Sequence, residues 1–167
     1  TSPAFRSIMG TNNGIGSAAI VFSGTEAQKQ KYLPKYASGE WISCFCLTEP
    51  DAGSDAAALK TSARREGDVY ILNGTKRFIT NAAVADTFNV MARTNPEIKG
   101  ARGISSFIVE KGTPGISIGP IDKKMGQAGS LTCDVIFEDC PVPAENLIGE
   151  EGEGFITAMK VLDRGRV

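Results

Sequence analysis

Hydrophobic positions follow a helical period at the start of the chain. One helical face is indicated by the spacing i, i+3, i+4 and i+7 of Ile15, Ala18, Ala19 and Phe22. A second helix is predicted directly afterwards, because Thr25 with Gln28 three positions later forms a capping-box pattern. We expect Pro34 to kink or tighten this helix and Gly39 to end it.

From Trp41 onward, apolar and polar residues alternate, which is the period of a β-strand. Asn73 and Gly74 stand between two such runs and predict a two-residue hairpin that joins strands at 69–72 and 76–80. Further strand candidates are residues 87–92, 104–110, 116–119 and 131–137. Because no helix is predicted between these short strands, the pattern favours an antiparallel β-barrel or sandwich.

The helical period returns at the end of the chain, where Phe155, Met159 and Leu162 repeat at i, i+4 and i+7. The predicted fold class is therefore α+β, a β domain flanked by helical remnants. Since the sequence opens without an initiator methionine and stops inside a predicted helix, we expect it to be part of a longer protein. The expected units are the end of a helical domain, a middle β domain and the start of a second helical domain, at residues 1–40, 41–151 and 152–167.

Composition restricts the possible functions of this 167-residue chain. With 41% hydrophobic and 22% charged residues, it is typical of a globular protein. Its longest apolar run, residues 18–22, is far below the ~20 residues of a membrane span. A net charge of −1 without a block of Lys or Arg argues against nucleic acid as a partner. The absence of histidine excludes Ser-His-Asp and Cys-His catalysis and every histidine-containing metal site.

Four cysteines are interpreted as structural free thiols. Cys44 and Cys46 lie two apart, on the same face of a predicted strand, and Cys133 and Cys140 flank another strand. This spacing matches poorly the C-x2-4-C pairs of zinc sites. We therefore expect no metal site, with a disulfide or a metal as the alternative.

The segment 47–55 is the first candidate binding element. A predicted strand ends in a turn where Gly53 allows close approach of the backbone, with the hydroxyls of Thr48 and Ser54 on either side. Such a loop could present N–H and O–H donors to an anionic or carbonyl-rich ligand. The alternative is an ordinary turn that its aspartates cap.

Other motifs carry weaker signals. Phe78 and Thr80, at the end of a predicted strand, could stack on a planar ligand and bond its edge, although a strand Phe is more often part of the core. Residues 14–19 match G-x-G-x-x-A, yet no buried strand precedes them, so we interpret the match as coincidence. Asp163 and Arg166 are spaced for an exposed ion pair.

Taken in order, these segments resemble the acyl-CoA dehydrogenase family, most of all its short-chain or butyryl-CoA branch. The motifs are Tyr-Leu-Pro, Leu-Thr-Glu-Pro-x-Ala-Gly-Ser-Asp, Asn-Gly-x-Lys-x-Phe-Ile-Thr-Asn, Thr-Pro-Gly, Phe-Glu-Asp-Cys-x-Val-Pro, Gly-x-Gly-Phe and Leu-Asp-Arg-Gly-Arg. The resemblance covers essentially the whole chain.

The resemblance implies an FAD enzyme that removes two hydrogens across the α and β carbons of an acyl-CoA thioester. It also implies electron transfer to an electron-transfer flavoprotein, a homotetramer, and a location in the bacterial cytoplasm or the mitochondrial matrix. Two alternatives remain open. One is an acyl-CoA oxidase-like flavoprotein, and the other is a non-catalytic β module that binds a partner.

Site residues follow from the resemblance position by position. The expected FAD contacts are Phe45, Cys46, Leu47, Thr48, Gly53, Ser54, Phe78, Ile79 and Thr80. The expected acyl-CoA contacts are Ser54, Asp163 and Arg166. Two residues depart from the family pattern, Phe78 in place of the commoner Trp and Ala128 in place of Arg. Some relatives carry the catalytic glutamate at the position of Gly165, so the resemblance implies a base located beyond residue 167 and no catalytic residue in this chain.

Overall fold

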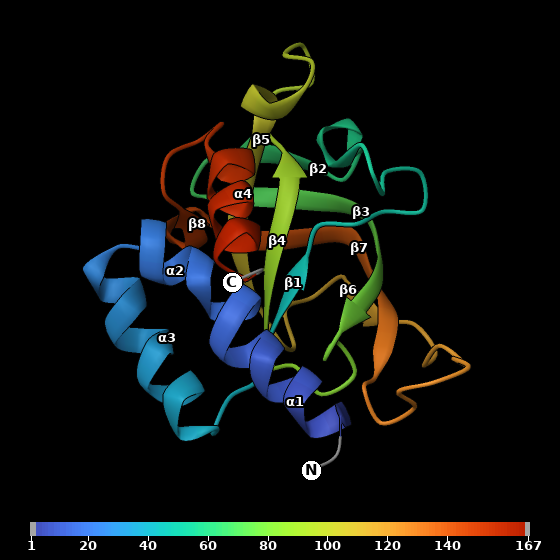
Figure 1. Ribbon diagram of the computed structural model, residues 1–167. Coiled ribbons are helices and arrows are strands. Elements are labelled where there is room, and N and C mark those ends of the chain that lie inside the picture. The colour runs from blue at the N-terminus through green and yellow to red at the C-terminus, as the bar shows by residue number, and fades with distance from the viewer. Residues whose placement is uncertain (1–2, 166–167) are drawn as a thin grey trace.

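A computed structural model describes residues 3–165, and it places helices from both ends of the chain against one sheet (Figure 1). The α-helices are α1 (Pro3–Gly10), α2 (Ser17–Ser23), α3 (Glu26–Ser38) and α4 (Gly154–Arg164), and a π-helical turn η1 (Thr11–Gly16) joins α1 to α2. The described residues also form three short 3-10 helices, η2 (Ala56–Ala58), η3 (Ala101–Gly103) and η4 (Ala144–Asn146). In Figure 1, α4 lies over β4 and beside α2, although the two helices are far apart in the sequence. None of the helices within residues 3–165 is long and apolar enough to cross a membrane.

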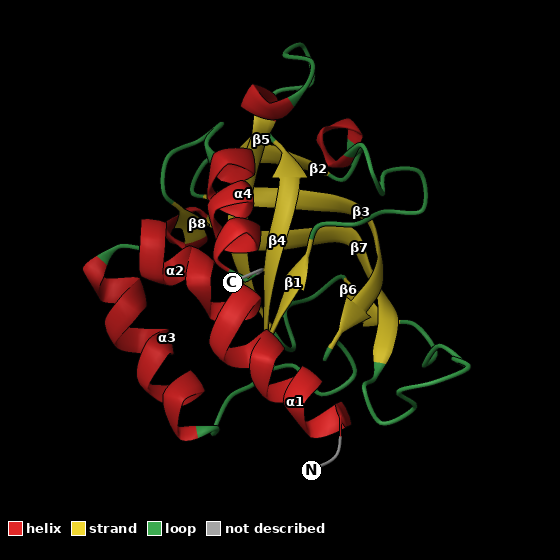
Figure 2. Cartoon of the chain, in the orientation of Figure 1, coloured by secondary structure: helices red, strands yellow, loops and turns green. Residues whose placement is uncertain are grey.

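The strands of the described residues form one eight-stranded sheet (Figure 2). They are β1 (Ser43–Cys46), β2 (Ser62–Glu66), β3 (Val69–Thr80), β4 (Thr87–Arg93), β5 (Ile104–Glu110), β6 (Ile116–Ile118), β7 (Thr132–Pro143) and β8 (Leu147–Ile148). The order is β6-β7-β3-β2-β4-β5-β8, with β1 paired to β4 off this path. The α+β class is confirmed, but the sheet does not close into a barrel, and β1 and β2 pair with β4 in parallel rather than antiparallel.

The predicted limits of α3 are confirmed by its caps. Thr25 Oγ1 accepts a hydrogen bond from the Gln28 N–H at 3.2 Å, and Gln28 Oε1 accepts one from the Thr25 N–H at 3.0 Å. Gly39 follows the helix with a φ of 76°, which glycine adopts without strain. Pro34 lies inside α3, and the helix continues past it to Ser38.

The hairpin predicted at Asn73–Gly74 is wrong, because β3 runs through both residues without a turn. The turn lies earlier, where Gly67 and Asp68 join Glu66 to Val69. Gly74 serves a different purpose, since a Cβ there would lie 2.7 Å from the Thr61 Cα. It also sits at a register shift between β3 and β7, so this glycine marks a bulge and a close backbone approach.

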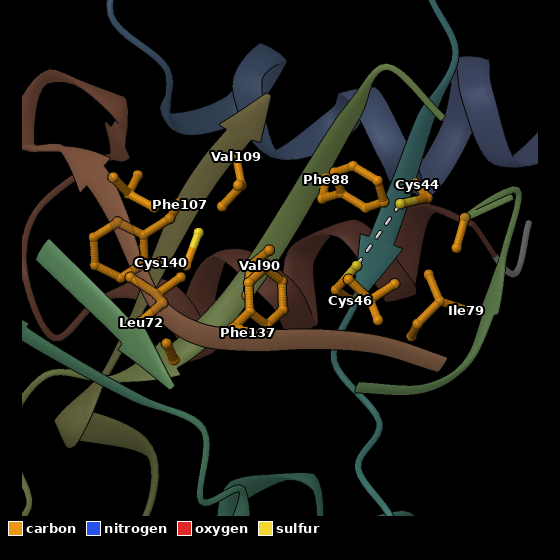
Figure 3. Close-up of a cluster of buried hydrophobic side chains, with 14 of the residues drawn as sticks. Cys44, Cys46, Leu72, Ile79, Phe88, Val90, Phe107, Val109, Phe137 and Cys140 are labelled. Atoms are coloured by element: carbon orange, nitrogen blue, oxygen red, sulfur yellow. Dashed lines mark hydrogen bonds between the residues drawn. The ribbon is translucent and has the colours of Figure 1, made fainter. Parts of the chain in front are cut away.

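One core cluster lies on the face of the sheet away from the helices, and Figure 3 shows its side chains pointing toward one another. It includes Leu72, Phe88, Val90, Phe107, Phe137 and all four cysteines. The cysteines are buried and free, as predicted. Burial raises the pKa of the Cys140 thiol to about 11 and also raises that of Cys44, whose Sγ lies 3.7 Å from the Cys46 Sγ. These thiols therefore act as small apolar core groups.

A second cluster lies between the sheet and the helices. Ile20 and Tyr32 from the N-terminal helices, Met91 and Ile108 from the sheet, and Val161 from α4 are all buried there. The two ends of the chain therefore share one core, which holds α4 at a fixed place over β4 and β5.

Candidate cofactor and substrate site

A pocket of about 550 Å³ opens where β1 ends, between the loop that follows β1, the end of β3, η1 and α4. This size is usual for a small-molecule site. Eight of the nine predicted cofactor residues line it: Phe45, Leu47, Thr48, Gly53, Ser54, Phe78, Ile79 and Thr80. The ninth, Cys46, is fully buried in the core cluster beneath the sheet. Because side chains alternate along a strand, Phe45 and Leu47 face the pocket while Cys46 faces away from it.

The opposite wall was not predicted from the sequence as part of a site. It consists of Thr11 and Ile15 from η1 and of Phe155, Met159 and Leu162 from α4. The signal was present as apolar residues at helical spacing, but such a stripe predicts a buried face equally well. Three more lining residues follow Ser54. Asp55 ends the candidate segment 47–55, and Ala56 and Ala57, in the short 3-10 helix after it, were not predicted.

The two remaining predicted residues lie at or beyond the end of α4. Asp163 is exposed and lines a neighbouring shallow pocket that shares Met159 and Leu162 with the main one. Arg166 lies outside the described residues. Gly165 directly follows α4 and provides no side chain that could take a proton.

Phe78 stands at the pocket in an unusual conformation. Its φ is 58°, rare for a residue with a side chain, and the residue is 63% exposed. The preceding residue anchors it, because the Arg77 N–H donates to the Thr48 carbonyl at 2.8 Å and the Arg77 guanidinium bonds both carboxylate oxygens of Asp134, at 3.0 and 3.2 Å. Such strain often accompanies function. Here it leaves an aromatic face available to a planar ligand.

Three hydroxyl groups line the same pocket as Phe78. Thr48 and Thr80 line the pocket from two strand ends, and Ser54 lines it from the loop. The hydrogen bonds found among residues 3–165 leave these three hydroxyls without a protein partner. The pocket thus combines apolar walls with a few convergent polar groups, as ligand sites do.

Glu49 directly follows the pocket residue Thr48, and its carboxylate is already fully engaged. Its carboxylate accepts hydrogen bonds from Lys76 Nζ and from the N–H groups of Lys60 and Thr61. Burial alone raises the pKa of Glu49, but the Lys76 charge and these hydrogen bonds outweigh burial and hold the pKa below its ordinary value. A carboxylate in this state is a poor general base.

Comparison with known proteins identifies the class. The family "Acyl-CoA dehydrogenase, middle domain" matches residues 44–140, and "Acyl-CoA dehydrogenase, N-terminal domain" matches residues 1–40. The chain belongs to the acyl-CoA dehydrogenase family.

Individual relatives are similar over nearly the whole chain. The short-chain specific acyl-CoA dehydrogenase of Clostridium acetobutylicum is 51% identical over 160 residues, which are 96% of this chain and 42% of that protein. A second similar chain comes from a structure described as the electron transferring flavoprotein of Acidaminococcus fermentans, in work on flavin-based electron bifurcation. It is 50% identical with a TM-score of 0.97, and the match covers 99% of this chain and 43% of that one.

A third similar protein is an acyl-CoA dehydrogenase of Bacillus anthracis that was solved in complex with FAD. It is 47% identical with a TM-score of 0.91, covering 98% of this chain and 28% of that one. This chain therefore spans less than half the length of each of these three proteins.

Proposed function

We propose that the full-length protein catalyses the FAD-dependent α,β-dehydrogenation of acyl-CoA thioesters, and that this chain supplies the flavin contacts and part of the acyl-CoA contacts. The observation that carries the proposal is the pocket, which gathers eight of the nine residues predicted to contact FAD from three separate segments. Membership of the acyl-CoA dehydrogenase family supports the same reaction.

The residues present fit a flavin. The exposed Phe78 ring offers a stacking surface, and the Thr48 and Thr80 hydroxyls beside it can donate to ring carbonyl and nitrogen atoms. Bound FAD supplies the acceptor for the hydride that leaves the β carbon of the substrate. The chain's own residues orient the ring and, through Phe155, Met159 and Leu162, exclude water from one side of it.

Substrate contacts are proposed for Ser54, Asp163 and Arg166. Ser54 lies in the loop that follows β1 and lines the main pocket, so its hydroxyl can bond either the flavin or the CoA arm. We propose no base among the described residues. Glu49 is engaged by three donors, and Glu151 accepts a hydrogen bond from the Tyr70 hydroxyl at 2.8 Å. Following the family resemblance, we propose a base located beyond residue 167.

The proposal extends to the rest of the protein. Residues 1–40 would end an N-terminal helical domain, 41–151 would form the middle domain, and 152–167 would begin a C-terminal helical domain. The electron acceptor would be an electron-transfer flavoprotein, and the full-length enzyme would be a homotetramer in the bacterial cytoplasm or the mitochondrial matrix.

The test is the visible spectrum of purified full-length protein. We expect a flavin absorbance that bleaches when a short acyl-CoA is added without oxygen, and turnover with an electron-transfer flavoprotein rather than with oxygen. The Thr48→Val, Ser54→Ala double variant should weaken FAD binding about five-fold or more, since each lost hydrogen bond to the ligand costs about 0.5–1.5 kcal/mol.

Different outcomes separate the alternatives. Rapid turnover with oxygen would support an oxidase instead. A colourless protein that gains no absorbance from added FAD would contradict the proposal and favour a binding module without catalysis.

A further inference from the structure

The loop that carries Gly53 and Ser54 is closed at both ends by one buried side chain. Glu49 begins the loop, and its Oε2 accepts from the Lys60 N–H at 2.6 Å while its Oε1 accepts from the Thr61 N–H at 2.9 Å. Its backbone also pairs with Ala52 through two hydrogen bonds of 3.0 and 3.2 Å. The Glu49 side chain is only 4% exposed, so water does not compete for these contacts.

Lys76 connects this carboxylate to two other walls of the pocket. Its Nζ donates to Glu49 Oε1 at 2.7 Å and to the Leu47 carbonyl at 3.2 Å, and its side chain is completely buried. Lys76 also stands two residues before Phe78 on β3, and the intervening Arg77 N–H holds the Thr48 carbonyl. Neither Glu49 nor Lys76 lines the pocket.

We propose that the Glu49–Lys76 pair is a positioning device that fixes three pocket walls against one another and thereby sets the affinity for FAD. The walls are the end of β1 at Leu47 and Thr48, the loop through Ser54, and the end of β3 at Phe78. This inference rests on the proposed function, because it takes FAD as the ligand. It assigns a role in the site to two residues that do not touch the ligand.

The hydrogen-bonding capacity of the two side chains explains why a charged pair, rather than a neutral one, can hold the loop and the strand ends together. One carboxylate accepts three donors simultaneously, whereas a glutamine amide has one acceptor oxygen and would turn its NH₂ group toward one of them. Burial lowers the pKa of Lys76, and the adjacent Glu49 charge opposes this effect. An apolar pair of similar size could fill the space, but it could neither hold the Leu47 carbonyl nor close the loop.

The decisive variant is therefore the double change Glu49→Gln, Lys76→Met in the full-length protein. It removes both charges together, so no unpaired ion remains buried. One backbone N–H and the Leu47 carbonyl lose their partners, so we expect the apoprotein to stay folded with a thermal unfolding midpoint a few degrees below that of the wild type. We nevertheless expect the dissociation constant for FAD, measured by flavin fluorescence titration, to increase at least ten-fold. The matched control is Asp51→Asn, which removes an exposed ion pair with Lys60 on the same loop and should leave FAD affinity unchanged.

A second variant tests the same inference in case the double variant does not fold. Glu49→Asp keeps the charge but shortens the side chain by one carbon, so it cannot reach Lys76 and both N–H groups together, and it should also weaken FAD binding. A folded double or Asp variant with wild-type FAD affinity overturns the inference alone. A wild-type protein that binds no FAD overturns the proposed function and this inference together.

Discussion

At the scale of single residues, Asn12 holds the π-helical segment η1 against β1. Its Oδ1 accepts from the Ser43 N–H at 2.7 Å and from the Ser43 hydroxyl at 2.9 Å, while its Nδ2 donates to the Tyr36 carbonyl at 3.2 Å. The residue is 1% exposed. Since β1 supplies Phe45 to the pocket, this side chain helps to place one pocket wall relative to another.

Replacing Asn12 by Ala should lower the free energy of unfolding by about 1–3 kcal/mol, because the Ser43 N–H would stay buried without an acceptor. Urea titration of the full-length protein measures the change. Asn13→Ala is the matched control, since Asn13 is the same residue type one position later and is exposed. Equal effects of the two substitutions would show that Asn12 carries no such bonding role.

Side chains that line the site were predictable from the sequence only on one wall. Thr48 and Ser54 lie in the loop after β1, whose residue types indicate ligand contact, and Phe78 lies near the end of β3, where the sequence signal is weaker. Met159 and Leu162 could not be distinguished from core residues, because apolar residues at helical spacing occur both on a face buried in the core and on a face that lines a pocket. The link between Glu49 and Lys76 joins positions 27 apart, and no local pattern reports such a contact.

At the scale of elements, the start of α4 depends on a glycine. A Cβ on Gly154 would lie 2.6 Å from the Ser105 Cα and 2.5 Å from the Ser106 N, both in the backbone of β5. The helix can therefore approach the sheet closely only if this position has no side chain. The same helix presents Phe155, Met159 and Leu162 to the pocket.

Gly154→Ala should reduce the free energy of unfolding by about 1–3 kcal/mol, because the backbone must move to admit the methyl group. It should also weaken FAD binding, since α4 shifts with its pocket residues. Gly10→Ala serves as the control, as nothing lies within 4 Å of its added Cβ. Its stability should be unchanged or higher by up to about 1 kcal/mol. Urea titration and flavin fluorescence titration measure the two effects. A Gly154→Ala protein with the urea midpoint and the FAD affinity of the wild type would contradict the close packing of α4 on β5.

The ends of a helix could be predicted from the sequence where capping residues within a few positions determine them. The pairing of strands could be predicted less well. The Thr25 cap and Gly39 end α3 by contacts within a few residues. At Asn73–Gly74 the local turn preference is overridden, because pairing of β3 with both β2 and β7 keeps the strand extended. The strand β2 was not predicted, since four of its five residues are exposed and mostly charged.

At the scale of the whole molecule, the pocket exists because both ends of the chain meet over the sheet. Thr11 and Ile15 come from the first helical segment and Phe155 from the last, and the buried cluster of Ile20, Met91 and Val161 holds these segments together. Sequence periodicity predicted the helices and the β region but not how they meet. Contacts between distant segments depend on tertiary packing, which local patterns do not encode.

The central claim is that this pocket holds the flavin of an acyl-CoA dehydrogenase. A crystal structure of the full-length protein with FAD tests it most directly. We predict that the isoalloxazine ring lies in the pocket, within about 4.5 Å of the Phe78 ring, with the Thr48 and Thr80 hydroxyls at its edge. A flavin bound elsewhere, with Phe78 and Thr48 facing solvent, would contradict the account.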